Sequence, residues 1–168
     1  MCGRFTLRTP AAAWVQEFLP LWSEDELSRL SGEHAIAARY NIAPTQSICT
    51  VRNSADDSII LDLSLLRWGL VPFWASDISV GSRMINARSE TVHEKRSFKS
   101  AFEKRRCLIP ADGYFEWQTT SDGKQPYLIE HRDGKMLAMA GLWERNRKLG
   151  QSQEEPLESC TIVTTSSN

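Results

Sequence analysis

Long hydrophobic runs are missing from this chain of 168 residues. No apolar stretch approaches the roughly 20 residues that a helix needs to cross a bilayer, so a transmembrane protein is excluded. The amino-terminal segment also lacks the basic-then-apolar pattern of an export signal. We therefore expect a cytoplasmic protein, and the compact chain without a targeting signal favours a bacterial host.

Clusters of metal ligands are missing as well. The three histidines are scattered without metal-ligand spacing, and no C-x-x-C pair occurs among the four cysteines, which are Cys2, Cys49, Cys107 and Cys160. This pattern argues against a zinc ribbon, and in a cytoplasm the cysteines are expected to be reduced thiols. No metal site is therefore expected.

The composition is that of an ordinary globular domain, with 41% hydrophobic and 24% charged residues. The length favours one hydrophobic core, so residues 1–168 are expected to form a single domain. The net charge is −1, but residues 83–106 hold eight basic and three acidic residues, a local charge of +5. Such a stretch is compatible with a phosphate-binding face, although charge counting alone favours a solvated helix surface.

The secondary-structure signals are mostly short strands separated by turns. Thr9 and Pro10 predict a helix start, with Thr9 as the N-cap and Pro10 at the first helical position. Asp133-Gly134 predicts a hairpin between its two flanking strands. The periodicity predicts a helix at 97–105 and strands at 61–65, 107–110, 114–119, 127–131, 136–142 and 160–165. Because hairpins are favoured over regular crossover helices, an α+β fold around an antiparallel sheet is expected.

Cys2 has the most distinctive chemistry in the chain. Methionine aminopeptidases remove an initiator methionine when the next residue is small, and the mature chain would then begin with Cys2. Its free amine, with an ordinary pKa of about 7.7–8.0, is partly neutral near neutral pH. That amine can attack an aldehyde to form a Schiff base, and the thiol can then close a thiazolidine ring. A mobile terminus without function is the plainer interpretation of Cys2 alone.

A second class of protein also begins with this cysteine. Glutamine amidotransferases of the N-terminal-nucleophile type mature to Cys-Gly and use the thiol on a glutamine amide, so Cys2-Gly3 leaves that class open. Their following residues are usually aliphatic, whereas Arg4 follows here. A fixed cation beside the nucleophile suits an anionic substrate such as a phosphodiester.

Two later segments carry polar side chains at strand spacing. In an extended conformation Asn86, Arg88 and Glu90 point to one side, which would bring an amide, a guanidinium and a carboxylate together. Strand alternation over residues 113–117 places Glu116 next to aromatic rings, where a partly desolvated carboxyl group is suited to proton transfer. An exposed polar strand face is the plainer interpretation of both segments.

The segment 68–74 is rich in aromatic residues although Gly69 and Pro72 favour an irregular conformation there. One interpretation is a loop that covers the core, which is the commoner fate of buried tryptophan. The other is a wedge or stacking platform for nucleotide bases, formed by Phe73 and Trp74.

Five motifs in order identify a family that the chain resembles. They are MCGRF at 1–5, RYNIAP at 39–44, RWGLVP at 67–72, INARSE at 85–90 and CLIPADGYFEW at 107–117. On these motifs the chain resembles the SRAP (SOS response-associated peptidase) family of abasic-site processing proteins over nearly its whole length. The resemblance implies a single SRAP-type α+β domain, with a barrel-like, mostly antiparallel β core and flanking helices.

The resemblance also implies a function in the DNA damage response. Family members are abasic-site sensors that link covalently to abasic sites in single-stranded DNA and at junctions with duplex DNA, which shields the lesion. They are classed as lyases or peptidases and need no metal or organic cofactor. For this chain the resemblance therefore implies a DNA partner, a nucleoid-associated location in the cytoplasm and, as the default, a monomer.

Residue roles carry over by position in the motifs. Cys2 would form the thiazolidine, Asn86 would orient the terminus or the sugar, and Glu116 would move protons. The residues expected to contact DNA through phosphates or bases are Arg4, Pro44, Phe73, Trp74 and Arg88.

The sequence departs from the family pattern at one histidine. Family members carry a His-x-Arg-Met-Pro-like motif soon after the strand that matches 160–165, and no histidine of this chain occupies that position. Because the sequence ends at Asn168, before that motif, we expect a fragment or a truncated gene product. The resemblance implies that the missing histidine protonates the sugar ring oxygen. Two activities stay open: a crosslinker that acts without the histidine, and a crosslink-deficient module that binds single-stranded DNA.

Overall fold

The computed structural model describes residues 2–20, 22–23, 25, 36–53, 61–152 and 155–166. In chain order its elements are β1 (Phe5–Leu7), α1 (Ala11–Phe18), β2 (Arg39–Ile42), β3 (Ser47–Asn53), β4 (Leu61–Trp68), the 3-10 helix η2 (Ile78–Arg83), β5 (Asn86–Arg88), α3 (Lys99–Lys104), β6 (Arg106–Ala111), β7 (Gly113–Thr120), β8 (Gly123–Glu130), β9 (Leu137–Asn146) and β10 (Leu157–Thr164). Within these residues, no helix combines the length and the apolar character that crossing a membrane requires.

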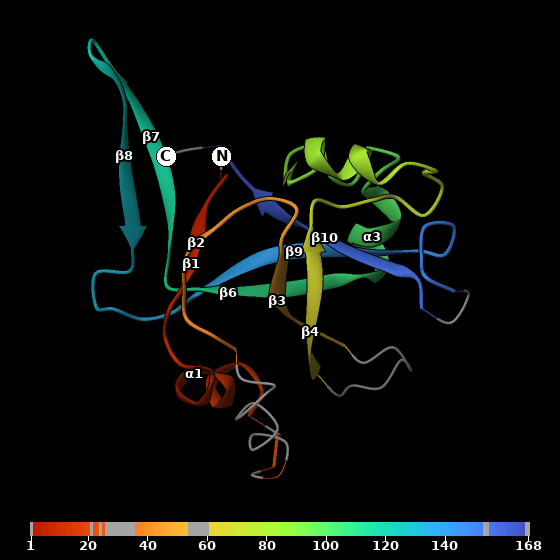
Figure 1. Cartoon of the computed structure of the whole chain (residues 1–168), viewed down its shortest axis with the longest axis horizontal. Coiled ribbons are helices and arrows are strands. Elements are labelled where there is room, and N and C mark those ends of the chain that lie inside the picture. The colour runs from red at the N-terminus through yellow and green to blue at the C-terminus, as the bar shows by residue number, and fades with distance from the viewer. Residues whose placement is uncertain are drawn as a thin grey trace.

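Five strands of the described chain close into a barrel. They pair in the order β4-β3-β6-β9-β10, and the ring closes where β10 runs parallel to β4, with Cys160 opposite Trp68. Farther along, β10 runs parallel to β5, with Ile162 opposite Asn86. The β-branched residues of these strands suit a pleated, half-buried surface. The barrel, seen in Figure 1, confirms the expected α+β fold with a mostly antiparallel core. β10 connects the barrel to β5.

A second, smaller sheet has the strand order β2-β1-β7-β8. Its β7–β8 hairpin projects away from the barrel at the upper left of Figure 1, and β8 is exposed along its whole length. The two sheets share one core, in which the ring of Phe5 meets Trp68 edge-on with 5.3 Å between centroids. This packing fixes β1, and with it the preceding Cys2, against the barrel.

Asp112 is the single residue between β6 in the barrel and β7 in the second sheet. Its carboxylate accepts hydrogen bonds from the backbone N–H groups of Arg8 and Thr9 and from the Thr9 hydroxyl. Burial raises the pKa of Asp112, but these hydrogen bonds outweigh burial and hold the pKa below its ordinary value. The Thr9 N-cap prediction is therefore wrong: α1 begins at Ala11 after Pro10, and the Thr9 side chain binds Asp112 instead.

The hairpin predicted at Asp133-Gly134 is also wrong. A turn does form there, with Gly134 at φ +67°, but the strands on its two sides lie in different sheets. β8 pairs with β7 through a tight turn at Gly123, whereas β9 pairs with β6 and β10. The Asp133-Gly134 turn reverses the chain locally. Burial of the β9 side chains then decides which strands β9 pairs with. The helix predicted at 97–105 is confirmed as the shorter α3.

The segment after β4 is held tightly against the barrel. Gly69 has φ +122°, and a Cβ atom there would lie 2.6 Å from the carbonyl oxygen of Gly81, so both the backbone angle and the space require glycine. The Asn146 side-chain amide donates to the carbonyl oxygens of Pro72 and Ala75 at 2.7 and 2.9 Å. These contacts fix the backbone around Phe73 although the segment is irregular.

Candidate functional site

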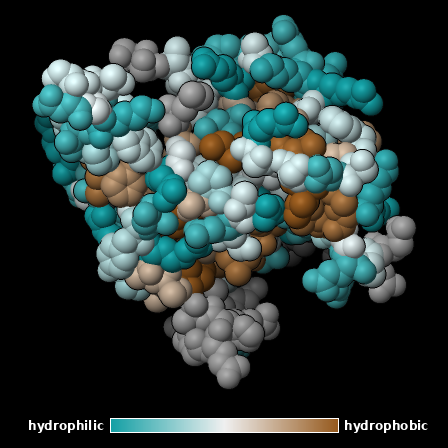
Figure 2. All heavy atoms as spheres, turned by 45° about the horizontal axis from the view of Figure 1, so that its top comes forward, coloured by the Kyte–Doolittle hydropathy of each residue, from teal (hydrophilic) through white to brown (hydrophobic). Residues whose placement is uncertain are grey.

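Cys2 lies at the edge of a pocket of about 830 Å³ where the two sheets meet. The pocket is lined by Cys2, Arg88, Tyr114, Glu116, Met139 and residues 162–166. These residues come from the chain start, β5, β7, β9 and the end of β10. We refer to it as the Cys2 pocket. Figure 2, which brings the top of Figure 1 forward, shows apolar atoms scattered among hydrophilic ones on this side of the molecule.

Cys2 is only 6% exposed. Burial raises the pKa of its thiol to about 11, and the carboxylate of Glu116 contributes in the same direction. The thiol donates a weak hydrogen bond to the carbonyl oxygen of Arg4, with 3.8 Å between sulfur and oxygen. The thiol is therefore protonated at neutral pH.

Asn86 holds the backbone of Cys2. Its Nδ2 donates to the Cys2 carbonyl oxygen at 2.7 Å, from a strand that β10 fixes in parallel register. The Asn86 Oδ1 is buried and has no hydrogen-bond partner among the described residues. An unpaired buried acceptor is costly, so this oxygen is available to a donor that a ligand or the chain terminus supplies.

Glu116 faces the same pocket from β7. β1 and β7 are antiparallel with Phe5 opposite Tyr114, a register that sets Glu116 beside the chain just after Cys2. Tyr114 and Glu116 line the pocket, while Phe115 and Trp117 pack together on the other face with 6.4 Å between ring centroids. The alternation predicted for this strand is confirmed. Glu116 is half-buried, as expected of a carboxyl group beside aromatic rings.

Arg88 and Glu90 lie near the same opening. Arg88 lines the Cys2 pocket. The Glu90 carboxylate accepts hydrogen bonds from the Ser166 backbone N–H at 2.9 Å and from the Thr165 hydroxyl at 3.5 Å. These contacts fix the chain after β10 along the rim of the pocket. β5 ends at Arg88 and Glu90 lies in the turn that follows, so the convergence of amide, guanidinium and carboxylate expected from an extended segment stays a prediction.

Arg4 and Pro44 lie outside the lining of the Cys2 pocket. The Arg4 guanidinium donates to the Asn41 side-chain oxygen on β2 at 3.0 Å. Pro44 sits in the turn between β2 and β3, next to Thr45, which has φ +72° and donates its backbone N–H to Trp68. The roles of Arg4 and Pro44 in DNA binding stay predictions.

Phe73 and Trp74 are placed differently from each other. Phe73 is 53% exposed and lines a second pocket, the basic pocket, which is described below. Trp74 is half-buried, and the Arg96 guanidinium lies 5.3 Å from its ring centroid, within cation–π range. Neither side chain lines the Cys2 pocket, and their contact with bases stays a prediction.

Sequence reasoning missed part of the Cys2 pocket. Met139 and residues 162–166 line it, but they show no polar motif or spacing that sets them apart from ordinary strand residues. Only the pairing of β10 with β5 and β9 brings them to Cys2. Among the described residues, no group of three or more His, Cys, Asp or Glu side chains is arranged to hold a metal ion.

Fold and site together define a small α+β barrel domain with a buried cysteine at the edge of a pocket that is also lined by a glutamate and an arginine. A model of one family, "SOS response associated peptidase (SRAP)", matches residues 1–168. The chain belongs to the SRAP family, which confirms the resemblance seen in the five motifs.

Comparison with individual proteins gives the same family. The chain is 38% identical to the abasic site processing protein YoqW of Bacillus subtilis, over all of this chain and 70% of that protein. It is 31% identical to the abasic site processing protein YedK of Escherichia coli, over 92% of this chain and 64% of that protein. A crystal structure of a Bacteroides thetaiotaomicron protein superimposes with a TM-score of 0.80 at 26% identity, over 99% of this chain and 69% of that one.

Proposed function

We propose that this protein processes abasic sites in DNA by forming a covalent thiazolidine crosslink through Cys2. The observation that carries the proposal is the Asn86 hydrogen bond of 2.7 Å to the carbonyl oxygen of Cys2, a residue that lines one pocket together with Glu116. This arrangement holds a potential aminothiol in front of a carboxylate. The names of relatives such as YoqW support abasic-site processing over the glutamine amidotransferase alternative.

The reaction needs the α-amine of Cys2, which removal of Met1 exposes. The neutral amine attacks the aldehyde carbon of the ring-opened deoxyribose, and the resulting carbinolamine loses water to become an imine. The thiol then adds across the imine: a C–S bond forms, and the thiol proton passes to the nitrogen. One water leaves for each thiazolidine that forms, and no oxidant is required.

Glu116, which lines the pocket, and Asn86, which binds Cys2, have distinct tasks in this reaction. Glu116 delivers a proton to the departing hydroxyl group and can take one from the attacking amine. Asn86 holds the Cys2 backbone through Nδ2 and offers its unpaired Oδ1 to the free amine or to a sugar hydroxyl. Because burial keeps the thiol protonated, the amine reacts first and the thiol follows.

The DNA strand would reach this pocket with its lesion turned outward. A base-free nucleotide is easily extruded because no stacking or pairing is lost there, and single-stranded DNA offers it without duplex opening. Arg88, on the pocket lining, is placed to bind a flanking phosphate. We place this activity on cytoplasmic DNA, with the protein acting as a monomer.

The proposal is tested with a single-stranded oligonucleotide that carries one abasic site. Wild type and Cys2→Ala are compared on a denaturing gel, and intact mass is measured for protein and adduct. A heat-resistant band that needs Cys2 and lacks the mass of Met1 is expected. If wild-type protein without Met1 gives no such band, the crosslinking proposal is rejected. A salt-dependent affinity for undamaged single strands would then leave the alternative of a crosslink-deficient DNA-binding module.

A further inference from the structure

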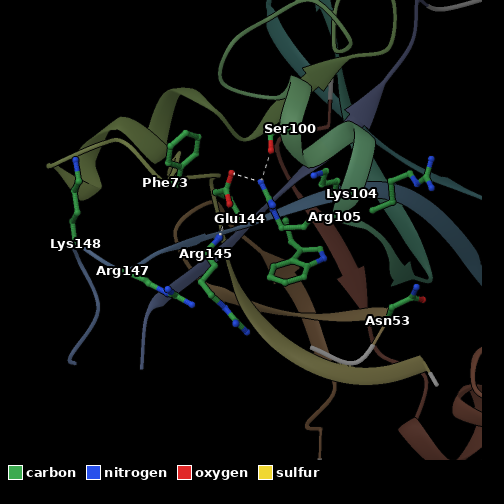
Figure 3. A pocket seen from close by; sticks show the side chains of 11 residues that line it. Asn53, Phe73, Ser100, Lys104, Arg105, Glu144, Arg145, Arg147 and Lys148 are labelled. Carbon is green, nitrogen blue, oxygen red and sulfur yellow. Dashed lines mark hydrogen bonds and ion pairs between the residues drawn. The ribbon is translucent and has the colours of Figure 1, made fainter. Parts of the chain in front are cut away.

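A second pocket, of about 890 Å³, lies at the other end of β9 from the Cys2 pocket. Among the residues that the structure describes, six basic side chains and one carboxylate, that of Glu144, line it; the basic residues are Lys104, Arg105, Arg106, Arg145, Arg147 and Lys148. Figure 3 shows Lys104 and Arg105 on one side of this basic pocket and Arg147 and Lys148 on the other, with Glu144 and Phe73 between them. Asn53, Ser100 and Trp143 complete the lining.

Only part of this positive charge is neutralised within the protein. Arg105 pairs with Glu144 at 2.8 Å, and Arg145 pairs with Glu158 at 2.8 Å. The Lys148 ammonium donates to the carbonyl oxygen of Trp74 at 3.3 Å, a contact that leaves its charge in place.

The other three cations are exposed and form no ion pair with a described carboxylate; they are Lys104, Arg106 and Arg147. Like charges that converge on one concavity repel one another, and a concave low-dielectric wall focuses their field. In a chain with a net charge of −1, this local excess is the electrostatic signature of a site for a polyanion.

The basic pocket and the Cys2 pocket are connected through the chain in two ways. Met139 of the Cys2 pocket and Arg145 of the basic pocket lie on the same strand, six residues or about 20 Å apart. The basic stretch 83–106 also begins near one pocket, where Arg88 lines the wall, and ends at the other with Arg106. A stacked DNA strand advances about 3.4 Å per nucleotide, so roughly six nucleotides cover this distance.

We propose that the basic pocket binds the phosphodiester backbone of the DNA strand whose abasic nucleotide occupies the Cys2 pocket, about six nucleotides from the lesion. This inference rests on the proposed function and adds a binding site remote from the reacting atoms. Exposed Phe73 on the pocket wall offers a face on which a base stacks. In this proposal the excess positive charge of residues 83–106 lies along the path of the bound DNA strand and is not only a solvated surface.

The test removes the three unpaired cations together, as Lys104→Ala, Arg106→Ala and Arg147→Ala. A matched control removes three exposed cations from the β7–β8 hairpin and the turn after it, as Lys124→Ala, Arg132→Ala and Lys135→Ala. Both triple variants lose the same charge, and circular dichroism checks that both stay folded. Affinity for an undamaged single strand of about 25 nucleotides is measured by fluorescence anisotropy as the salt concentration is varied.

For the pocket variant we expect the slope of log affinity against log salt to fall in magnitude by about 2, since each phosphate contact on a single strand contributes about 0.7. The hairpin control is expected to retain the wild-type slope. Equal slopes for the pocket variant and wild type overturn the proposal. A second outcome also overturns the proposal. If calorimetry shows that wild type binds inorganic phosphate and the pocket variant does not, while the salt slope for DNA binding is the same in both, the pocket serves a small phosphate ligand.

Crosslinking kinetics separate this proposal from the proposed function. Oligonucleotides of about five and about 25 nucleotides, each with a central abasic site, are compared. Compared with wild type, the pocket variant is expected to need a several-fold higher concentration of the long oligonucleotide for half-maximal crosslinking rate. The concentration of the short oligonucleotide for half-maximal rate and the maximal rate are expected to be unchanged. Equal losses with both lengths overturn the remote site. If wild type crosslinks neither oligonucleotide, the proposed function fails, and the salt titration still decides the basic pocket.

Discussion

The Cys2 pocket and the basic pocket differ in charge far more than in size. One arginine and one glutamate line the Cys2 pocket beside its thiol, so the formal charges of Arg88 and Glu116 cancel. Of the described residues, six cations and one carboxylate line the basic pocket, and none of its described lining residues is a cysteine. In the functions proposed here, reactivity and electrostatic attraction belong to separate pockets of the domain. Imine chemistry needs a partly neutral amine, which an excess of carboxylates would hold in its charged form, whereas strand binding needs an excess of cations.

Replacing Cys2 with serine should have the largest effect, because it should abolish the crosslink and leave DNA binding unchanged. In Cys2→Ser an α-amine can still form an imine, but a hydroxyl is a much weaker nucleophile than a thiol, so the thiazolidine does not form. The heat-stable crosslink is expected to fall to background, while the salt slope for DNA binding stays at the wild-type value. Denaturing gels and anisotropy measure the two quantities. A change in the salt slope would show that the two pockets are not independent.

Glu116→Gln should produce the next largest effect. The amide keeps the shape of the side chain but cannot transfer a proton, and general acid–base catalysis typically contributes about 100-fold or more. The single-turnover rate of crosslinking is expected to fall by about that factor at saturating DNA, without a change in the concentration for half-maximal rate. Gln118→Glu, which alters an exposed position on the same strand, serves as the control. An unchanged rate in Glu116→Gln would remove Glu116 from the mechanism.

The raised pKa of the Cys2 thiol predicts slow alkylation at neutral pH. Its pKa of about 11 lies above the ordinary value of 9.0, so the folded protein holds the proton over a range where an unfolded chain releases it. Since the thiolate is the reactive species, alkylation should accelerate about tenfold per pH unit up to that pKa. At neutral pH the unfolded chain should react about 100-fold faster at this position. Iodoacetamide labelling, followed by mass analysis of the Cys2 peptide, measures the rates.

Glu144→Gln should have the smallest effect, on the charge of the basic pocket and on the stability of the fold. The Glu144 carboxylate is 4% exposed, binds Arg105 at 2.8 Å and accepts the Arg145 backbone N–H at 2.9 Å. Neutralising it leaves Arg105 without its counter-ion, so the free energy of unfolding is expected to fall by about 1–3 kcal/mol. The basic pocket becomes more positive at the same time, so affinity for the long single strand should rise a few-fold. Urea unfolding and anisotropy measure both changes.

Exposed Glu103→Gln on α3 is the matched control for this variant. It removes one negative charge close to Lys104 in sequence without breaking a buried ion pair. Its stability should change by less than about 0.5 kcal/mol. A similar loss of stability in both variants would mean that the Arg105–Glu144 pair is not the cause.

Local sequence pattern predicted the alternation of β7 and strands that overlap β4, β6, β7, β8, β9 and β10, but it predicted no strand at β1 or β3. The spacing in 113–117 placed Glu116 on the pocket face because side-chain direction in a strand depends only on parity. Pattern failed at Thr9, where the choice between capping a helix and binding Asp112 depends on a residue about a hundred positions away. It also failed at Asp133-Gly134, because a turn sequence reverses the chain but does not select the partner strand.

The amino-acid sequence by itself determined the reactive groups, the family motifs and the local excess of positive charge in 83–106, since these depend on residue identity and near neighbours. Only the tertiary structure decided which groups meet. The parallel pairing of β10 with β5 brings Asn86 to Cys2, and the long strand β9 separates the two pockets. Such contacts depend on which strands share a core, and that depends on burial summed over the whole chain.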